Sequence, residues 1–417
     1  MATDNSQHFP RLTQLDITAP MAERKPHKSM HHGRELSDPY FWLKDQNYPN
    51  VDDSQVLDYL EEENRYYKNF LDPNQRLVDT IFSEFKGRTD EEEESVSFEK
   101  NGYLYRWFYP VDGDYRAYER QNINTGKKQV ILDETELAKD FDYFVIGDWK
   151  ISPDNKLLAY TFDVTGDERY RLKIFDLQLG MYLPDELVDV QEEIEFSADG
   201  TSLVYLLLEK DRWHSKKVNI HRIGDSQDAD KTIYYEEDDG YFIGMQLTSD
   251  EKYLLISSSQ GEVQEAYALD TKSLDSQPQK LIDRSAGFTL SIDHAHGYFY
   301  ILANDTHKNF RLARTQDNQL EYSKWQTIEE GVDDVYLMGL QTFEDFIVIK
   351  SRNSGVDIIS IRSYNGNQHT VSFPEKIATL YIGQNSQFTQ SFVRLSFQSM
   401  VSPPIIFDYH VKQRNLD

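Results

Sequence analysis

The feature that most constrains the fold is an internal repeat that begins near residue 96 and continues to the end of the sequence. Each copy opens with a turn rich in Asn, Asp and Gly that leads into an apolar strand, as in "SPDNKLLAYTFD" and "TSDEKYLLISSS". A further strand and turn follow, as in "YRLKIFDLQLG". Seven copies of the first half meet seven copies of the second. Equivalent strand positions are Tyr103, Leu157, Leu203, Tyr253, Tyr298, Phe346 and Phe392.

The spacing of these copies predicts the architecture. Successive equivalent positions are 54, 46, 50, 45, 48 and 46 residues apart. A period of this length with about four strands per unit is typical of a β-propeller, whose blades pack around a central channel. A β-sandwich needs no such fixed, long period. We therefore predict an all-β fold, a seven-bladed β-propeller over residues 86–417.

The last copy differs from the others. In complete copies the second turn is followed by another apolar strand, such as "KKQVILDE", but the last copy has only "KQRNLD". We expect the outermost strand of the last blade to be missing, which would leave an edge that natural folds usually cover. A strand from "ESVSFEKN" could close the ring instead. The pattern favours a truncated chain.

Residues 1–85 have a different, helical pattern. Val56, Leu57 and Leu60 recur near helical spacing with acidic residues between them, which predicts an amphipathic helix from about residue 53 to 70. Asp53 and Ser54 are its candidate N-caps. A second predicted helix, "NQRLVDTIFSEFKG", follows Pro73. We expect these residues to form a short N-terminal helical arm.

Composition limits the classes of partner. The formal net charge of −28 opposes binding to nucleic acid or to an anionic membrane surface. A cationic partner fits this charge better, but the interpretation that we favour from charge alone is that the acidity keeps the protein in solution. The chain has no Cys, which suits a reducing compartment. No segment approaches the roughly 18–20 apolar residues of a membrane span, and the N-terminus lacks the apolar core of a signal peptide. We expect a cytoplasmic protein.

Short catalytic and cofactor motifs are missing from the sequence. It contains no G-x-S-x-G, G-x-x-x-x-G-K-[ST], G-x-G-x-x-G or H-E-x-x-H pattern. A catalytic triad can also be assembled from distant residues, so this absence weakens nucleophilic catalysis without excluding it. We assign no catalytic, cofactor-binding or metal-binding residue.

Four local features have both a functional and a structural interpretation. His294 and His296 would share one face of a strand and could bind a metal, but no third ligand is indicated and a polar turn is favoured. The run containing His27, His31 and His32 is interpreted in the same way. The acidic run 90–94 could attract a cationic peptide, but we favour a solvated linker. Residues 304–312 are interpreted as a turn between strands.

A combination of motifs goes beyond a generic propeller. "HGRELSDPYFWLKD", "LDYLEEENRYYKNFL", "YLYRWFYPVDGDYRAYERQ" and "YFYILANDTHKNFRLAR" occur in this order and resemble the N-terminal part of the prolyl oligopeptidase family, most of all its oligopeptidase B (protease II) branch. The resemblance covers roughly residues 20–417. Its signature positions, which we interpret as structural or domain-packing residues, are Asp38, Pro39, Tyr40, Trp42, Asn304, Asp305, Asn309 and Phe310.

The resemblance implies that this chain is part of a longer protein whose domains have different roles. The arm would pack on a C-terminal α/β-hydrolase domain, and the propeller would restrict access to short peptides. That domain would cut by a Ser, Asp and His triad with an oxyanion hole, after Arg and Lys in members similar to oligopeptidase B. It is expected beyond residue 417, so no triad residue can be named here and this chain alone should be inactive. Two alternatives stay open: a free-standing propeller that binds peptides or proteins, and a prolyl-specific relative.

Overall fold

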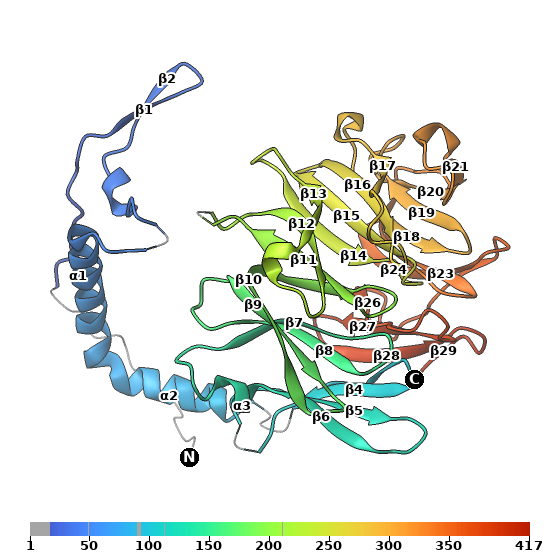
Figure 1. Cartoon of the computed structure of the whole chain (residues 1–417), viewed down its shortest axis with the longest axis horizontal. Helices are drawn as coiled ribbons and strands as arrows, with labels where there is room; N and C mark the ends of the chain where they lie inside the picture. Colours follow the sequence, from blue (N-terminus) through green and yellow to red (C-terminus); the bar gives the residue numbers. More distant parts are fainter. Residues whose placement is uncertain (1–16, 49, 90–92, 112, 211) are drawn as a thin grey trace, which may run out of the picture. The chain divides into compact units, whose positions relative to one another are not determined.

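The computed structural model describes residues 17–48, 50–89, 93–111, 113–210 and 212–417 (Figure 1). The chain divides into two compact units, Met1–Glu91 and Glu92–Asp417. The sequence pattern predicts this boundary near residue 85. None of the helices that the structure describes combines the length and the apolar character that a membrane span requires.

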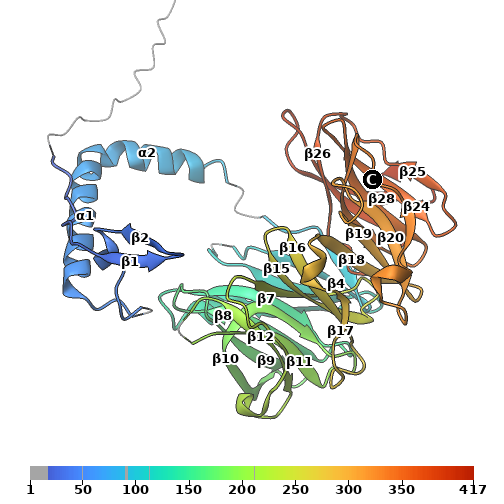
Figure 2. The same ribbon diagram turned by 90° about the horizontal axis from the view of Figure 1, so that it is seen from above.

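The first unit contains a small hairpin and two successive helices (Figure 2). Its elements are β1 (Lys28–His31), β2 (Arg34–Ser37), η1 (Phe41–Leu43), α1 (Ser54–Leu71), η2 (Asp72–Asn74) and α2 (Gln75–Lys86). Asp53 is the N-cap of α1, and its carboxylate accepts a hydrogen bond from the Gln55 amide at 2.8 Å. Pro73 lies in η2, where the chain changes direction because proline cannot continue α1. Both predicted helices and the Asp53 cap are confirmed.

The second unit is an all-β propeller built from antiparallel sheets whose strands follow one another in chain order. The first sheet contains β3 (Phe98–Lys100), β4 (Tyr103–Phe108), β5 (Ala117–Asn122) and β6 (Lys128–Asp133), and is followed by α3 (Glu134–Ala138). The next sheet contains β7 (Val145–Ile151), β8 (Leu157–Asp163), β9 (Tyr170–Asp176), β10 (Met181–Phe196), β11 (Ser202–Leu208), β12 (Ser215–Arg222) and β13 (Lys231–Tyr235), with η3 (Gln227–Ala229) before β13.

Four further sheets complete the unit. They are β14 (Phe242–Leu247), β15 (Tyr253–Gln260), β16 (Val263–Asp270) and β17 (Gln279–Ile282); β18 (Leu290–Ala295), β19 (Tyr298–Ala303), β20 (Arg311–Gln316) and β21 (Gln326–Glu329); β22 (Val335–Thr342), β23 (Phe346–Asn353), β24 (Val356–Ser363) and β25 (Gln368–Thr370); and β26 (Thr379–Ile382), β27 (Phe392–Gln398), β28 (Ile405–His410) and β29 (Asn415–Leu416). Short helices η4 (Arg284–Ala286) and η5 (Tyr322–Lys324) lie in connections.

The number of separate sheets differs from the predicted number of blades. In the described ranges there are five four-stranded sheets and one seven-stranded sheet, so seven separate blades are not observed. The reason is β10, which pairs with β9 through its first part and with β11 through its second. Its register shifts on both sides of Asp189, whose φ of 55° lies in the left-handed region.

Two expectations about the ends of the repeat need correction. The outermost strand of the last sheet is not missing, because β29 pairs with β28 over two residues. The segment "ESVSFEKN" does not close the last sheet either. Its residues Phe98–Lys100 form β3, which pairs with β4 in the first sheet.

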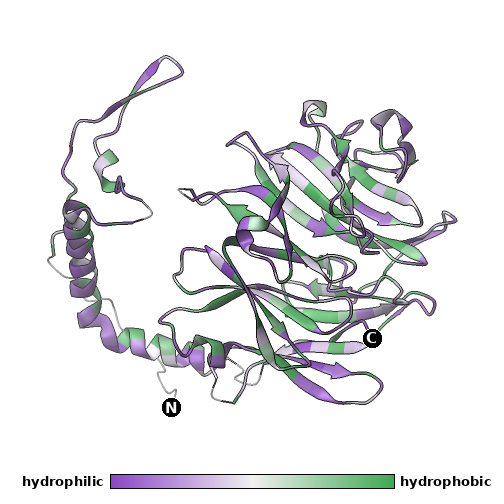
Figure 3. Ribbon diagram, viewed as in Figure 1, coloured by the Kyte–Doolittle hydropathy of each residue, from purple (hydrophilic) through white to green (hydrophobic). Residues whose placement is uncertain are grey.

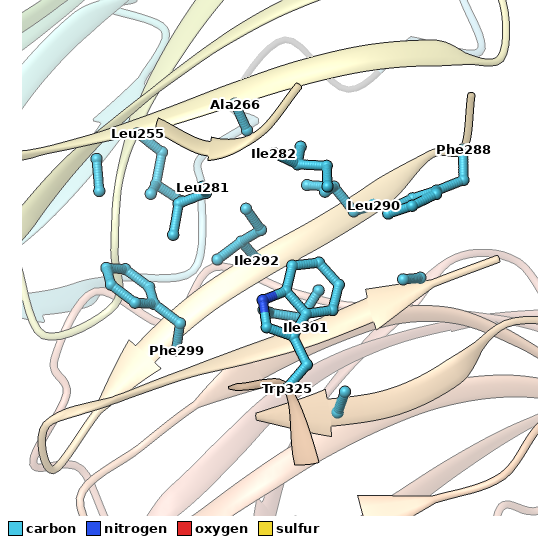
Figure 4. Close-up of a cluster of buried hydrophobic side chains, with 13 residues drawn as sticks. Leu255, Ala266, Leu281, Ile282, Phe288, Leu290, Ile292, Phe299, Ile301 and Trp325 are labelled. Atoms are coloured by element: carbon cyan, nitrogen blue, oxygen red, sulfur yellow. The ribbon is translucent and has the colours of Figure 1, made fainter. Parts of the chain in front are cut away.

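The strands are apolar on both faces because each sheet packs between two neighbours. In β19, Phe299 and Ile301 pack toward the sheet that begins with β14, and Figure 4 shows this cluster. Tyr300 and Leu302, which alternate with them, pack toward the sheet that begins with β22. Successive side chains of a strand point to opposite faces, so the residues of a run such as "YFYIL" pack into the hydrophobic clusters on both sides of their sheet. Figure 3 shows the resulting hydrophobic stretches along the strands.

Six buried apolar clusters in the described part of the chain join consecutive repeat units. The last sheet reaches the first through a polar contact. Arg394 on β27 forms two hydrogen bonds with Asp408 on β28, at 2.8 and 2.9 Å, and donates a third to the Ser97 carbonyl at 2.7 Å. Arg394 therefore links the two ends of the repeat across 297 positions of sequence.

Candidate functional site

One end of the propeller carries the connections that lead into the innermost strands, and we call it the connector face. The hairpins between second and third strands lie at the same end, because neighbouring strands are antiparallel. Contacts between consecutive copies of the repeat agree with this placement. The Arg169 side chain, in the β8–β9 hairpin, donates to the Glu209 and Lys210 carbonyls in the β11–β12 hairpin, at 2.6 and 2.9 Å.

The connector face exposes many large apolar side chains. Phe242 is 60% exposed at the start of β14, Trp213 is 52% exposed in the β11–β12 hairpin, and Ile377 is 77% exposed before β26. The exposed large apolar residues of this face include Val96, Val111, Phe141, Tyr143, Val145, Trp213, Phe242, Val332, Tyr336, Ile377, Met400 and Val401. The turns between the innermost and second strands, at the opposite end, contain none among their described residues. The hairpins between third and fourth strands, also at that end, expose Ile123, Leu179 and Tyr322 singly. A gathering of apolar side chains such as that on the connector face is typical of an interaction surface.

Ion pairs connect the innermost strands around the channel. Lys150 on β7 lies 2.9 Å from Glu195 on β10 and 3.3 Å from Asp148. Burial by itself would lower the pKa of Lys150, but the two carboxylates outweigh it and raise that pKa. Lys100 at the end of β3 lies 2.7 Å from Glu251, in the β14–β15 turn. Since these two sheets are not consecutive, that ion pair crosses the channel opposite the connector face.

A cavity of about 320 Å³ opens between the innermost strands β10, β14 and β18. Its lining includes Glu193, whose Oε2 atom is buried and has no hydrogen-bond partner among the described residues. Burial raises the pKa of Glu193, and the negative charges of Glu192 and Asp148 raise it further. An unpaired carboxylate in such surroundings favours a cationic guest.

The first four signature residues organise the loop after β2. The Asp38 carboxylate accepts a hydrogen bond from the Tyr40 amide at 2.9 Å, and the Asp38 amide donates to the His27 carbonyl at 3.0 Å. The Pro39 carbonyl accepts from the Lys25 amide at 2.9 Å. These contacts hold two segments of the arm together.

Within the arm, Trp42 links the segment before β1 to α1. Its indole N–H donates to the Glu23 carbonyl at 2.8 Å, and the Lys25 ammonium lies 4.3 Å from its ring centroid. The ring meets Tyr59 of α1 edge to face, with centroids 6.1 Å apart. Domain packing by these residues stays a prediction.

Asn304 and Asp305 stabilise the connection between β19 and β20. The Asn304 side chain accepts a hydrogen bond from the Thr289 amide at 2.7 Å. Asp305 accepts from Arg311 at 2.6 Å and from the Tyr322 hydroxyl at 2.8 Å. Burial would raise the pKa of Asp305, but these hydrogen bonds outweigh it and lower that pKa.

Asn309 and Phe310 join the same connection to the next sheet. The Asn309 amide group donates to the Val332 carbonyl at 2.9 Å, and the Asn309 carbonyl accepts from the Leu337 amide at 3.0 Å. Phe310 has a φ of 66° and packs edge to face against Tyr336, with centroids 5.7 Å apart. The two signature groups, in the arm and in this connection, belong to different units, and each makes its contacts within its own unit.

The two histidines of "DHAHG" do not act together. The buried His294 lies 2.6 Å from Asp250 through Nδ1 and 3.6 Å from Asp317 through Nε2. His296 is in the following turn, with a φ of 53°, and its Nε2 lies 2.7 Å from the Glu344 carbonyl. No group of three or more His, Asp or Glu side chains suited to a metal ion occurs within the described ranges.

The other local features are also structural where they are described. His27 stacks on Phe41, with centroids 3.7 Å apart, and His31 lies 3.0 Å from the Ser29 hydroxyl. His32 occupies the β1–β2 turn with a φ of 50°. In the acidic run 90–94, residues 90–92 lie outside the described residues. Glu94 forms an ion pair with Arg106 and a β-bridge with Phe108.

Sequence reasoning missed Glu193 and Arg394. Both contact or face groups that are distant along the chain, so no local motif indicates them. A weak signal was available for Glu193, since "VQEEIEF" places consecutive acids in a strand whose alternate residues are apolar.

Comparisons with known proteins agree with this architecture. Residues 20–417 match the sequence model described as "Prolyl oligopeptidase, N-terminal beta-propeller domain". The chain is 26% identical over 413 residues to dipeptidyl aminopeptidase BI of Pseudoxanthomonas mexicana and 27% identical over 403 residues to protease 2 of Moraxella lacunata. These alignments cover 95% and 94% of the chain but 57% of each relative.

Solved structures show the same fold. Oligopeptidase B from Leishmania major superimposes with a TM-score of 0.88 at 21% identity, and oligopeptidase B from Trypanosoma brucei, with covalently bound antipain, gives 0.85 at 22% identity. Each match covers 96% of this chain and 60% of the other. The chain therefore spans less than two thirds of the length of these relatives. It belongs to the prolyl oligopeptidase family and corresponds to the N-terminal β-propeller domain of its peptidases.

Proposed function

We propose that this chain is the arm and the substrate-selecting propeller of an oligopeptidase B-like serine endopeptidase, which cleaves short peptides after Arg or Lys in the cytoplasm. The observation that carries the proposal is the family match over residues 20–417, together with coverage of only 57–60% of the relatives' length. The catalytic α/β-hydrolase domain supplies the Ser, Asp and His triad and acts as the partner of both units. Residues 1–417 alone select substrates and do not hydrolyse them.

The propeller has seven blades in this proposal. The first part of β10 is the outer strand of one blade, and its second part is the inner strand of the next. The seven-stranded sheet then contributes two four-stranded blades that share β10, and the five other sheets contribute one each. The left-handed conformation of Asp189 supports this division, since it lies where the pairing partner changes.

The connector face docks on the catalytic domain. Its exposed apolar residues provide the contact area. Strand direction supports this orientation, because β3 begins at the connector face and β29 runs back toward it from β28. The arm contributes a second apolar surface, since Ile81, Phe82 and Phe85 of α2 are 44%, 65% and 66% exposed.

The charge of the propeller suits basic peptides. The formal net charge of the whole chain is −28, and acidic side chains of the propeller such as Glu193 and Glu195 lie on an innermost strand. A field of this sign raises the local concentration of cationic peptides at the channel. The cross-channel pair Lys100–Glu251 limits entry at the far end by size.

The first test is the intact mass of the native protein in its source cells, detected with an antibody against residues 96–417. We expect a species of roughly 75–80 kDa, because a further domain of about 250 residues would follow the 48.9 kDa seen here. The purified species should cleave fluorogenic peptides with Arg or Lys before the cut and should be inactivated by a serine-directed reagent. A species at 48.9 kDa alone would favour a free-standing binding module. Preference for Pro before the cut would assign a prolyl-specific enzyme.

A further inference from the structure

The cavity beside Glu193 has the size of a site for one side chain. Its volume is about 320 Å³, at the lower end of the roughly 300–1,000 Å³ of small-molecule sites. Glu193, Gln246 and Ser291 contribute polar groups from β10, β14 and β18, which are innermost strands. Ser257 and Gln264 add polar groups from β15 and β16. The cavity therefore admits one extended polar chain from the channel side and not a folded segment.

The charges around this cavity are unbalanced. Lys150 is the cation whose charge acts on Glu193, and it is already paired with Glu195 and Asp148. Glu193 receives little compensation from it, and its buried Oε2 has no partner among the described residues. Leaving a buried carboxylate oxygen without a donor is costly. A guanidinium or ammonium group in the cavity would supply the positive charge that Glu193 lacks, acting on the partly accessible side chain rather than on the enclosed Oε2 atom.

Room for the guest is provided partly by Gly244. This glycine lines the cavity, and a Cβ added there would have only the Ser257 hydroxyl within 4 Å, at 3.6 Å. That is an ordinary van der Waals distance, and the backbone of Gly244 is not in a conformation that requires glycine. A methyl group at position 244 would consequently narrow the cavity without straining the fold.

We propose that this cavity is a cation-binding subsite of the propeller, in which Glu193 receives the terminal guanidinium or ammonium group of an Arg or Lys side chain. The assignment of that side chain to a peptide substrate rests on the proposed function. Binding of the cation itself does not, because every residue of the subsite lies in this chain. The subsite holds a basic residue of an entering peptide by charge and hydrogen bonding.

The test measures binding to the 417-residue chain with a pair of matched probes. Nα-acetyl-arginine amide carries the guanidinium group, and Nα-acetyl-citrulline amide has nearly the same shape without the charge. We expect the arginine probe to bind about tenfold more tightly, since a charge-assisted hydrogen bond is worth roughly a factor of ten or more. Equal affinity for the two probes, or no detectable binding of either, would overturn the proposal.

Two variants and one matched control locate the site. Glu193→Gln keeps the shape but removes the charge, and should abolish the preference for arginine over citrulline. Gly244→Ala should weaken both probes by a similar factor. Glu192→Gln removes the same charge from the adjacent, exposed residue, which does not line the cavity, and should change the preference less than twofold. If Glu192→Gln matched Glu193→Gln, a general field would explain the binding and the subsite would be rejected.

The pH dependence gives a second readout that a purely structural role would not affect. Glu193 faces Glu192, Asp148 and Glu195, with Lys150 as the neighbouring cation. Its pKa is raised, so its charge is lost at a higher pH than that of an ordinary Glu. Arginine binding to the native chain should weaken as the pH falls from 7.5 toward 5, whereas the Glu193→Gln variant should show a flat profile. A cleaving full-length enzyme whose propeller fails these tests would leave the proposed function intact and refute the subsite alone.

Discussion

At the scale of single residues, one buried carboxylate of this propeller, Glu236, is stabilised by a donor from the next repeat of the chain. Glu236, next to β13, accepts hydrogen bonds from Arg284 at 2.7 Å and from the Tyr234 hydroxyl at 3.0 Å. Arg284 also donates to Glu265 on β16 at 2.9 Å. Burial would raise the pKa of Glu236, but these hydrogen bonds, above all those from Arg284, lower it to about 2. The ionised form of Glu236 therefore holds two sheets together.

This depressed pKa gives a pH-dependent contribution to stability with a defined sign. The contribution is complete above the unfolded-state pKa of about 4.3 and is lost as the pH falls toward the folded-state value of about 2. Replacing Glu236 with Gln should reduce the fall of the unfolding free energy between pH 4.5 and 2.5 by at most about 1.4 kcal/mol per pH unit. Urea titrations across that range measure it. An equal change in Glu237→Gln, whose side chain is exposed, would contradict the assignment.

At the scale of elements, the closure of the ring depends on a polar contact between β27 and the segment before β3. Arg394 is 8% exposed, and it donates to Asp408 and to the Ser97 carbonyl. Arg394→Met would leave the Asp408 carboxylate and that carbonyl without their donor, at a cost of roughly 2–4 kcal/mol. Denaturant unfolding should show this loss. Arg352→Met removes a half-exposed guanidinium from the buried Asp357, but this carboxylate keeps the Lys350 ammonium at 3.6 Å and the Leu380 amide at 3.3 Å, so the variant should cost clearly less. A similar loss in both variants would mean that Arg394 has no special role in closure.

The sequence was sufficient to predict the helices and most of the strands, but not how consecutive repeats are joined or how the two ends of the repeat meet. The equivalent positions of the repeat are the first or second residues of β4, β8, β11, β15, β19, β23 and β27. This success follows from period-two alternation, which is local. The continuity of β10 and the presence of β29 were missed, because a bend at Asp189 and a two-residue strand leave almost no apolar pattern. The roles of Arg394 and Glu193 depend on contacts between segments that are distant along the chain. A repeating pattern of apolar residues carries no information about such contacts.

At the scale of the whole molecule, the connector face exposes more large apolar side chains than the opposite end of the propeller. Phe242 and Ile377 are exposed on the connector face. Contact with another domain would be the simplest reason for large apolar side chains at these positions. Leu179, in the β9–β10 turn, is 71% exposed and lies away from that face. If the proposed catalytic domain covers the connector face, a charge on it should matter only in the longer protein.

The corresponding experiment introduces Asp at these positions in both lengths of the protein. Phe242→Asp and Ile377→Asp should shift the melting temperature of residues 1–417 by little, because exposed side chains contribute within about 0.5 kcal/mol. In the full-length enzyme the same changes should speed proteolytic separation of the two halves and lower peptidase activity several-fold, since a charge would be buried without a partner. Leu179→Asp should have neither effect. Loss of stability in the short chain would show that these side chains serve the propeller itself, and equal effects of all three variants would leave the connector face without a docking role.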